Sequence, residues 1–164
     1  MFEEDEDDYE DKRDVRELPL FKKGQEILEV VRVLADLMPE DDDHYLRSLK
    51  GDMLYYAGLL TVKIAGAEGV EIYDLKMEAA TIIRKAARDL MVMNHSLEDF
   101  GFKDVEYFQI VRDLIEEYRL LFIDWVSGFD KWNYSIDRWG LFNPPGVTPF
   151  DKDPDDDIPF SGFD

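Results

Sequence analysis

The feature that most limits how this chain can fold is an apolar stripe within residues 103–129. Its large apolar side chains recur at alternating spacings of three and four, which places them on one face of an α-helix; they are Phe108, Val111, Ile115, Tyr118, Phe122, Trp125 and Phe129. The face is widened beyond a two-helix seam by Tyr107, Ile110, Leu114 and Leu121. Because so broad a face must be covered from two sides, the stretch predicts one helix of a bundle.

Two further helices are predicted near the N-terminus. The first runs from Leu20 to Met38, is stopped by Pro39, and carries an inner face of Leu20, Ile27, Val31, Leu34 and Met38. The second runs from about His44 to Ala67, and its inner face is Leu46, Leu49, Met53, Ala57, Leu60 and Ile64. Four small residues weaken this second helix, so we expect a neighbouring helix or a second subunit to approach them closely; they are Gly51, Gly58, Ala65 and Gly66.

The third predicted helix spans about Ile72 to Asn94. Its main inner face is Leu75, Ala79, Ile82, Ala86, Leu90 and Met93, with Ala80, Ile83, Ala87 and Met91 beside it. A link over residues 95–102 follows, and Asp104 is the expected N-cap of the fourth helix. Four helices joined by short links predict an all-α, antiparallel up-down-up-down four-helix bundle over residues 18–128.

The segments outside the bundle have a different character. Residues 129–150 form an aromatic strap that ends near the sequence Asn-Pro-Pro-Gly, and we expect it to pack on its own bundle or on a partner. Its candidate partner-binding residues are Trp132, Trp139 and Phe142. Residues 1–17 and 151–164 are acidic and poor in apolar residues, so both are predicted to be disordered tails.

The net charge of −20 restricts the partners of this chain. The two tails hold more than half of that excess, and residues 18–150 are still acidic. Phosphate backbones repel such a protein, so direct nucleic-acid binding is not expected and basic proteins are the expected partners. With no cysteine, no signal-like N-terminus and no apolar run long enough for a bilayer, we expect a soluble, cytoplasmic protein without membrane association.

No pattern of a catalytic, cofactor or metal site occurs in the sequence. His44 and His95 lack the Glu-x-x-His context of a di-iron bundle and have no cysteine near them for zinc, so we interpret both as surface or turn residues. Asp151, Asp153 and Asp155 alternate as in a calcium loop, but the required glycine and closing glutamate are missing. The best remaining carboxylate pair for acid–base chemistry is Glu68 with Glu71, but two solvated acids at a helix end are the simpler interpretation.

One junction resembles a known family. The sequence Ile-Ala-Gly-Ala-Glu-Gly at residues 64–69, followed by Ala79-Ala80 and Ala86-Ala87, resembles the Ile-Ala-Glu-Gly region of a bacterial four-helix-bundle family. That family includes proteins encoded in intervening sequences of large ribosomal RNA and accessory variability proteins of retroelements, and the likeness covers residues 18–128. This chain departs from it by an apparent Gly66-Ala67 insertion. The resemblance implies a non-enzymatic bundle that assembles into a ring-like homo-oligomer.

The C-terminal tail carries a second resemblance. Asp155, Asp156, Asp157, Ile158, Pro159 and Phe160 are similar to the acidic tip of bacterial single-stranded-DNA-binding proteins, which recruits replication and repair enzymes through a basic-rimmed apolar pocket. In those proteins the final Phe supplies the terminal carboxylate, whereas residues 161–164 follow here. The resemblance implies a docking peptide, and the alternative is a solubilising acidic tail.

Taken with the residues, these features predict a non-enzymatic adaptor or assembly protein that self-associates and binds a basic protein partner, without cofactor or metal. Two other functions stay open. One is an acidic decoy or recruiter that acts on replication, repair or retroelement proteins through the tail at residues 155–160. The other is an enzyme that uses carboxylate chemistry.

Overall fold

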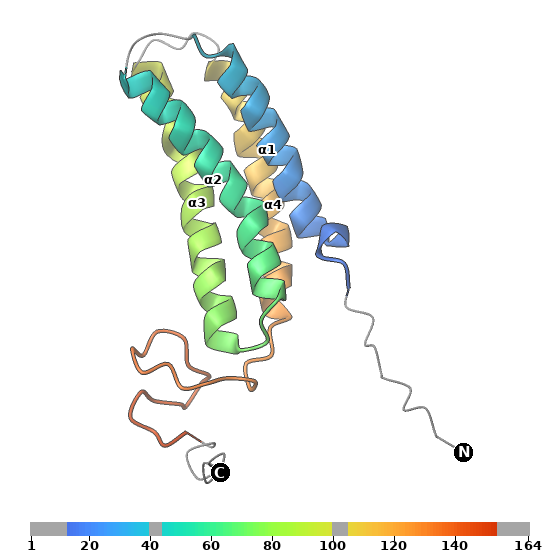
Figure 1. Ribbon diagram of the computed structural model, residues 1–164, viewed down its shortest axis with the longest axis vertical. Helices are drawn as coiled ribbons and strands as arrows, with labels where there is room; N and C mark the ends of the chain where they lie inside the picture. Colours follow the sequence, from blue (N-terminus) through green and yellow to red (C-terminus); the bar gives the residue numbers. More distant parts are fainter. Residues whose placement is uncertain (1–12, 40–43, 100–104, 154–164) are drawn as a thin grey trace, which may run out of the picture.

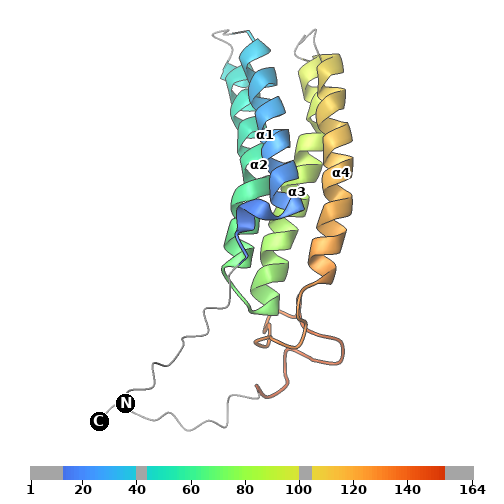
Figure 2. The same ribbon diagram turned by 90° about the vertical axis from the view of Figure 1, so that its right-hand side faces the viewer.

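The computed structural model describes residues 13–39, 44–99 and 105–153, and these form a four-helix bundle. The helices are α1 (Pro19–Leu37), α2 (His44–Glu68), α3 (Tyr73–Asp99) and α4 (Phe108–Ser127). They run up and down in turn, and α1 packs against α2 and α4 while α3 packs against the same two helices (Figures 1 and 2). No strand occurs within the described ranges. The predicted all-α antiparallel bundle is confirmed.

The start of α1 follows from local chemistry. Pro19 occupies the first helical position, where its missing N–H costs nothing, and extended Leu18 precedes it. A short 3₁₀ turn, η1 (Val15–Glu17), comes first, and its cap Asp14 accepts a 3.0 Å hydrogen bond from the Arg16 backbone N–H. Order therefore begins before Leu18, inside the segment where we expected disorder. Residues 1–12 lie outside the described part of the chain.

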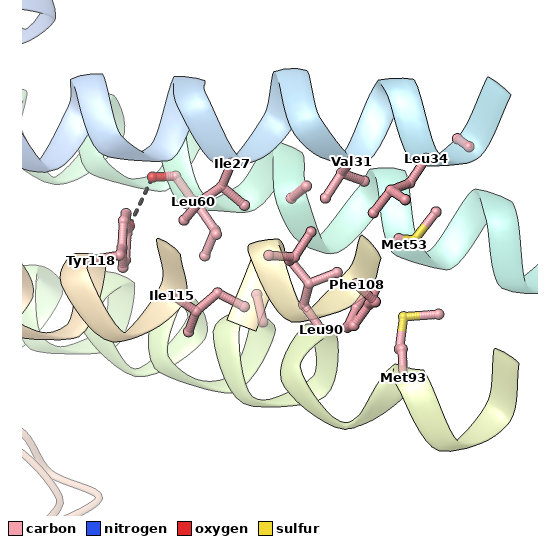
Figure 3. Close-up of a cluster of buried hydrophobic side chains, with 14 of the residues drawn as sticks. Ile27, Val31, Leu34, Met53, Leu60, Leu90, Met93, Phe108, Ile115 and Tyr118 are labelled. Atoms are coloured by element: carbon pink, nitrogen blue, oxygen red, sulfur yellow. Dashed lines mark hydrogen bonds between the residues drawn. The ribbon is translucent and has the colours of Figure 1, made fainter. Parts of the chain in front are cut away.

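The core lies along the bundle axis and uses the inner faces predicted for the first two helices. All the predicted residues of α1 and α2 are buried, and Met38 is buried just beyond the end of α1. Figure 3 shows side chains from all four helices meeting there, among them Ile27, Leu60, Leu90 and Phe108. These four are each 0% exposed. Burial of such faces, rather than helix propensity, supplies most of the stability of a bundle.

Two close contacts fix α1 and α4 against the middle of α2. A Cβ added to Gly24 of α1 would lie 2.7 Å from the backbone oxygen of Leu60, so the two helices cross with no room for a side chain. The hydroxyl of Tyr118 donates a 2.8 Å hydrogen bond to that same oxygen (Figure 3). Burial raises the pKa of Tyr118, so the phenol stays a hydrogen-bond donor.

The inner face of α3 differs from the prediction. Its buried residues are Ala80, Ile83, Ala86, Leu90, Met93 and Leu97. Ala79 and Ile82 are only half-buried and Leu75 is exposed, so the face predicted for the first half of this helix was wrong by one position. Apolar residues occupy two adjacent faces of this half of the helix. Because α3 packs against both α2 and α4, the residues that point between those two helices are the ones that are buried. The helix also continues past Asn94 because Leu97 extends the buried line.

The stripe of α4 is buried along its first half only. Phe108, Val111, Ile115 and Tyr118 are buried, whereas Phe122 and Trp125 are half-buried and Phe129 is buried again beyond the helix end. Of the widening residues, Leu114 and Leu121 are half-buried, but Tyr107 and Ile110 are exposed, against expectation. The single turn η2 (Val105–Tyr107) precedes α4, and the predicted cap Asp104 lies outside the described residues.

The small residues of α2 do not bring a neighbouring helix close. A Cβ added at Gly51, Gly58 or Gly66 would meet no atom within 4 Å. The expected close approach within the bundle was therefore wrong at these glycines, and it occurs at Gly24 of α1 instead. Approach by a second subunit stays a prediction.

The aromatic strap lies beneath one end of the bundle, by the end of α2 and the start of α3, rather than along a groove between helices (Figures 1 and 2). The Tyr73 backbone N–H donates a 2.8 Å hydrogen bond to the Asn133 oxygen, which ties the strap to the first residue of α3. Among the described helices, none combines the length and apolar character needed to cross a bilayer.

Candidate functional site

A pocket of about 670 Å³ opens at the bundle end where the strap begins. Its walls come from the start of α1, the α2–α3 connection, the end of α4 and the first residues of the strap. The side chains that decide its chemistry are Arg13, Glu68, Glu71, Lys76, Asp124, Trp125, Phe129 and Asp130. This volume is typical of sites that take a small molecule or a single side chain with its flanking residues.

Trp125 and Phe129 form the apolar wall of this pocket. Their rings meet edge to face with centroids 4.7 Å apart. The Trp125 indole N–H donates a 2.7 Å hydrogen bond to Glu68 Oε1, which satisfies the polar end of the ring. Lys76 lies over the Phe129 ring, 5.2 Å from its centroid, and its Nζ also donates to the Ala67 oxygen at 2.9 Å. Glu68 therefore holds the edge of the Trp125 ring, and Lys76 covers one face of the Phe129 ring.

Acidic residues outnumber basic ones around the pocket, where Arg13 and Lys76 are the two bases among the lining residues. Lys76 is already bound to the end of α2 and to Phe129, and Glu68 is bound to Trp125. Within the described ranges, the side-chain carboxylates of Glu71 and Asp124 make no hydrogen bond or ion pair with another residue, although the backbone oxygen of Asp124 accepts from the Ser127 hydroxyl at 2.6 Å. An aromatic wall next to free carboxylates suits a cationic group such as an arginine or lysine side chain.

The carboxylate pair that the sequence offered for acid–base chemistry, Glu68 with Glu71, lines this pocket. Glu68 and Glu71 are both exposed, and Glu68 is engaged with Trp125. No group of three or more His, Cys, Asp or Glu side chains suited to a metal ion occurs among the residues that the structure describes. His44 and His95 are both exposed, which agrees with their interpretation as surface residues.

Below the pocket, Asp137 organises the middle of the strap. Its carboxylate accepts hydrogen bonds from three backbone N–H groups, those of Trp139 at 2.9 Å and of Leu141 and Phe142 at 2.8 Å each. These bonds to the ionised form hold the pKa of Asp137 below the usual range of an aspartate. Asn143 closes the loop from the other side, because its side chain accepts from the Asp137 N–H at 2.8 Å and donates to the Asp137 oxygen at 2.9 Å.

The last part of the strap folds back on the Asp137 loop. Arg138 Nη1 donates to the backbone oxygens of Pro149 and Asp151 at 3.0 and 2.6 Å. Asp151 accepts from the N–H and the hydroxyl of Thr148, at 2.9 and 2.8 Å, and these bonds lower its pKa. Gly140 has φ of +76° and lies so close to Pro149 that a Cβ would be 2.8 Å from the ring. The strap is thus an ordered loop with no helix or strand.

This ordered loop presents large apolar side chains to solvent. The exposed fractions are 66% for Trp132, 92% for Trp139, 75% for Leu141 and 94% for Phe150. We call these four residues the strap patch. Phe142, the third strap residue predicted to bind a partner, is half-buried instead, while Phe129, Ile136 and Pro144 are buried. The predicted tail residues from Asp155 to Phe160 lie outside the described part of the chain.

Sequence reasoning missed Leu141, Phe150 and the organising role of Asp137. The signal for Asp137 was present, because an aspartate followed three residues later by glycine is typical of a tight turn, and Gly140 occupies that place. The exposure of Leu141 and Phe150 depends on the long-range bonds of Arg138 and Asn143. No local pattern predicts those bonds.

The Asp137 loop predicts a specific response to mutation and to pH. Asp137→Asn should leave the melting temperature of the bundle nearly unchanged and speed amide exchange at Trp139, Leu141 and Phe142, since an amide cannot accept three such bonds equally well. Because folding lowers the pKa of Asp137, the stabilising effect is complete above about pH 4, the ordinary aspartate value, and is lost as the pH falls through the lower folded value.

Hydrogen exchange followed by mass spectrometry or NMR measures this effect directly. Asp130→Asn is the matched control, since among the described residues the Asp130 carboxylate accepts from one backbone N–H, that of Trp132, at 3.0 Å. Equal protection of the three amides in wild type and Asp137→Asn would show that the carboxylate does not hold the loop.

No protein-family model, curated protein or solved structure matches this chain. The two resemblances noted in the sequence, to the bacterial four-helix-bundle family and to the acidic tip of single-stranded-DNA-binding proteins, therefore stay hypotheses.

Proposed function

We propose that this protein is a non-enzymatic adaptor that binds a protein partner through the strap end of its bundle. The observation that carries the proposal is the strap patch. Trp139 and Phe150 are almost completely exposed on a loop that hydrogen bonds hold in one conformation. Leaving such apolar area in water is unfavourable, and a fixed loop loses little entropy when a partner covers it.

The chemistry of this end indicates what the partner presents. An apolar surface is needed to cover Trp132, Trp139, Leu141 and Phe150. A basic side chain next to that surface would enter the pocket, stack on Trp125 and meet the free carboxylates Glu71 and Asp124. The partner is therefore a protein with a basic, partly apolar docking segment. Its positive charge also fits the net charge of −20, which speeds encounter with basic proteins.

A photo-crosslinking experiment tests this proposal in cells that contain the protein. p-Benzoylphenylalanine at position 139 should capture a partner, whereas the same group at Tyr55, an aromatic residue 63% exposed on α2, should not. Trp139→Ala should then weaken binding of the captured partner by about 2 kcal/mol or more, or about thirtyfold, as expected of a buried tryptophan anchor. Tyr55→Ala should leave the affinity unchanged.

The pocket carboxylates are expected to act differently from the tryptophan. Glu71→Gln with Asp124→Asn should slow association and reduce its dependence on salt, with a smaller effect on dissociation. Surface plasmon resonance at several salt concentrations separates the two rates. The proposal is wrong if Trp139→Ala binds the partner as wild type does, or if crosslinks at positions 55 and 139 capture the same proteins equally well.

A further inference from the structure

A second surface lies between α3 and α4, on the side of the bundle opposite the α1/α2 pair. It is a groove of about 290 Å³, and its floor is apolar. The floor residues are Ile83, Ala87 and Met91 from α3 and Ile115, Phe122 and Ile123 from α4. Of the four neighbouring helix pairs, α3 and α4 make the least contact, and this groove is the consequence. Ile123 is the most exposed of these apolar residues, at 53%.

The rim of the α3/α4 groove is basic. Arg84 and Arg88 of α3 and Arg119 of α4 line it, with Glu116 as the one acid among the lining residues. Arg119 donates to Glu116 at 3.0 Å, so that pair is internally neutral. Across the described ranges, Arg84 and Arg88 form no ion pair, and both are exposed. Two free arginines therefore stand beside an apolar floor in a chain of net charge −20.

The placement of these arginines is unfavourable for the helix itself. They lie four residues apart, so their like charges repel on one face of α3. No acid occupies a position three or four residues from either of them on the helix. The positive charge is therefore available to an anionic ligand, and the floor beside it requires that ligand to carry apolar groups as well.

One segment of this chain has that combination. Asp155, Asp156 and Asp157 supply three consecutive carboxylates, and Ile158 and Phe160 follow them with Pro159 between. The carboxylates match Arg84 and Arg88, while the two large apolar side chains match the floor. Proline lowers the entropy that such a peptide loses on binding.

The reach of the chain decides which copy supplies the segment. The last described part of the strap lies beneath the bundle (Figure 1), and a fully extended chain adds at most about 14 Å between residues 153 and 157. Arg84 and Arg88 are 11 and 15 residues beyond Tyr73, or about 16 and 22 Å up the helix. Carboxylates of the same chain could therefore approach the lower arginine only with the linking residues fully extended, which costs conformational entropy. A second copy has no such restriction.

We propose that the α3/α4 groove binds residues 155–160 of a second copy of this chain. Ile158 and Phe160 fill the apolar floor, and the aspartates pair with Arg84 and Arg88. The contact joins copies through a tail and a groove, so it requires neither the strap patch nor the pocket beside it. It supplies a physical route to self-association.

Sedimentation velocity of the full chain at rising concentration tests the first part of this proposal. The wild type should associate beyond its monomer mass of 19.3 kDa, and higher salt should weaken the association. Phe160→Ala with Ile158→Ala, and separately Arg84→Glu with Arg88→Glu, should each weaken it at least tenfold. The matched control is Lys22→Glu with Arg32→Glu, which reverses two exposed charges on α1 and should leave association unchanged.

Exchanging the charges of the tail and the groove distinguishes direct pairing between these residues from a general effect of net charge. A chain with Asp155→Arg, Asp156→Arg and Asp157→Arg should bind the Arg84→Glu, Arg88→Glu chain more tightly than it binds wild type. Circular dichroism and melting curves confirm that each variant is folded. The proposal is overturned if wild type stays at 19.3 kDa at every concentration, if the tail variants associate like wild type, or if the exchanged pair shows no gain in affinity.

Discussion

Phe108→Ala is expected to reduce the free energy of unfolding by about 3–5 kcal/mol, the range for removing a large aromatic ring from a packed core. Phe108 is 0% exposed and belongs to the buried cluster that joins all four helices (Figure 3). The shell of helices around it cannot close completely on the space that the ring leaves. Since whole domains are stable by only about 5–15 kcal/mol, this loss is a large part of the total.

The neighbouring Tyr107 gives a matched control for that substitution. It is 47% exposed, so Tyr107→Ala should cost less than about 1 kcal/mol although it removes a side chain of similar size. Urea unfolding followed by circular dichroism measures both values. Equal costs at the two positions would mean that the stripe of α4 is not buried in the way described here.

The second large effect is expected at Gly24, where an added methyl group has no space. A Cβ at this position would lie 2.7 Å from the Leu60 oxygen and 3.0 Å from Thr61 Cγ2. Backbone atoms cannot move aside as a flexible side chain can, so Gly24→Ala must push α1 away from α2. We expect a cost of about 1–3 kcal/mol, even though alanine is the better helix former.

The same substitution at Gly51 should have the opposite sign. Gly51 lies within α2 with no atom within 4 Å of an added Cβ, so Gly51→Ala should stabilise the protein by about 0.5–1 kcal/mol. Thermal or urea unfolding of the two variants side by side gives the comparison. If both alanines stabilise the protein, α1 and α2 do not cross at Gly24 as closely as described.

The bundle could be predicted from the sequence because the spacing of apolar residues along a helix indicates which of its faces is buried. In α1 and α2 each helix has one dominant apolar face, and every residue predicted there is buried. In α3 two faces were nearly equal, and contact with two neighbouring helices selected the line through Ala80 and Ile83. Such a choice depends on tertiary packing, which the spacing of apolar residues in one helix does not contain.

The candidate site was predicted less completely. The aromatic strap was identified from its composition, and Trp132 and Trp139 are exposed as partner-binding residues need to be. Its shape depends on Asp137, Arg138 and Asn143 bonding to backbone groups up to 13 residues away. Likewise, the position of the α3 arginines beside an apolar floor follows from the packing of α4 against α3.

The placement of the tryptophans also determines what intrinsic fluorescence can report. All three tryptophans of the chain, Trp125, Trp132 and Trp139, lie at the strap end of the bundle, and the central core has none. Only Trp125 is substantially shielded, so the emission change on unfolding comes chiefly from its separation from Glu68 and Phe129. Fluorescence therefore follows the opening of one end, whereas circular dichroism follows all four helices. A difference between the two unfolding midpoints would measure how far that end opens before the bundle unfolds.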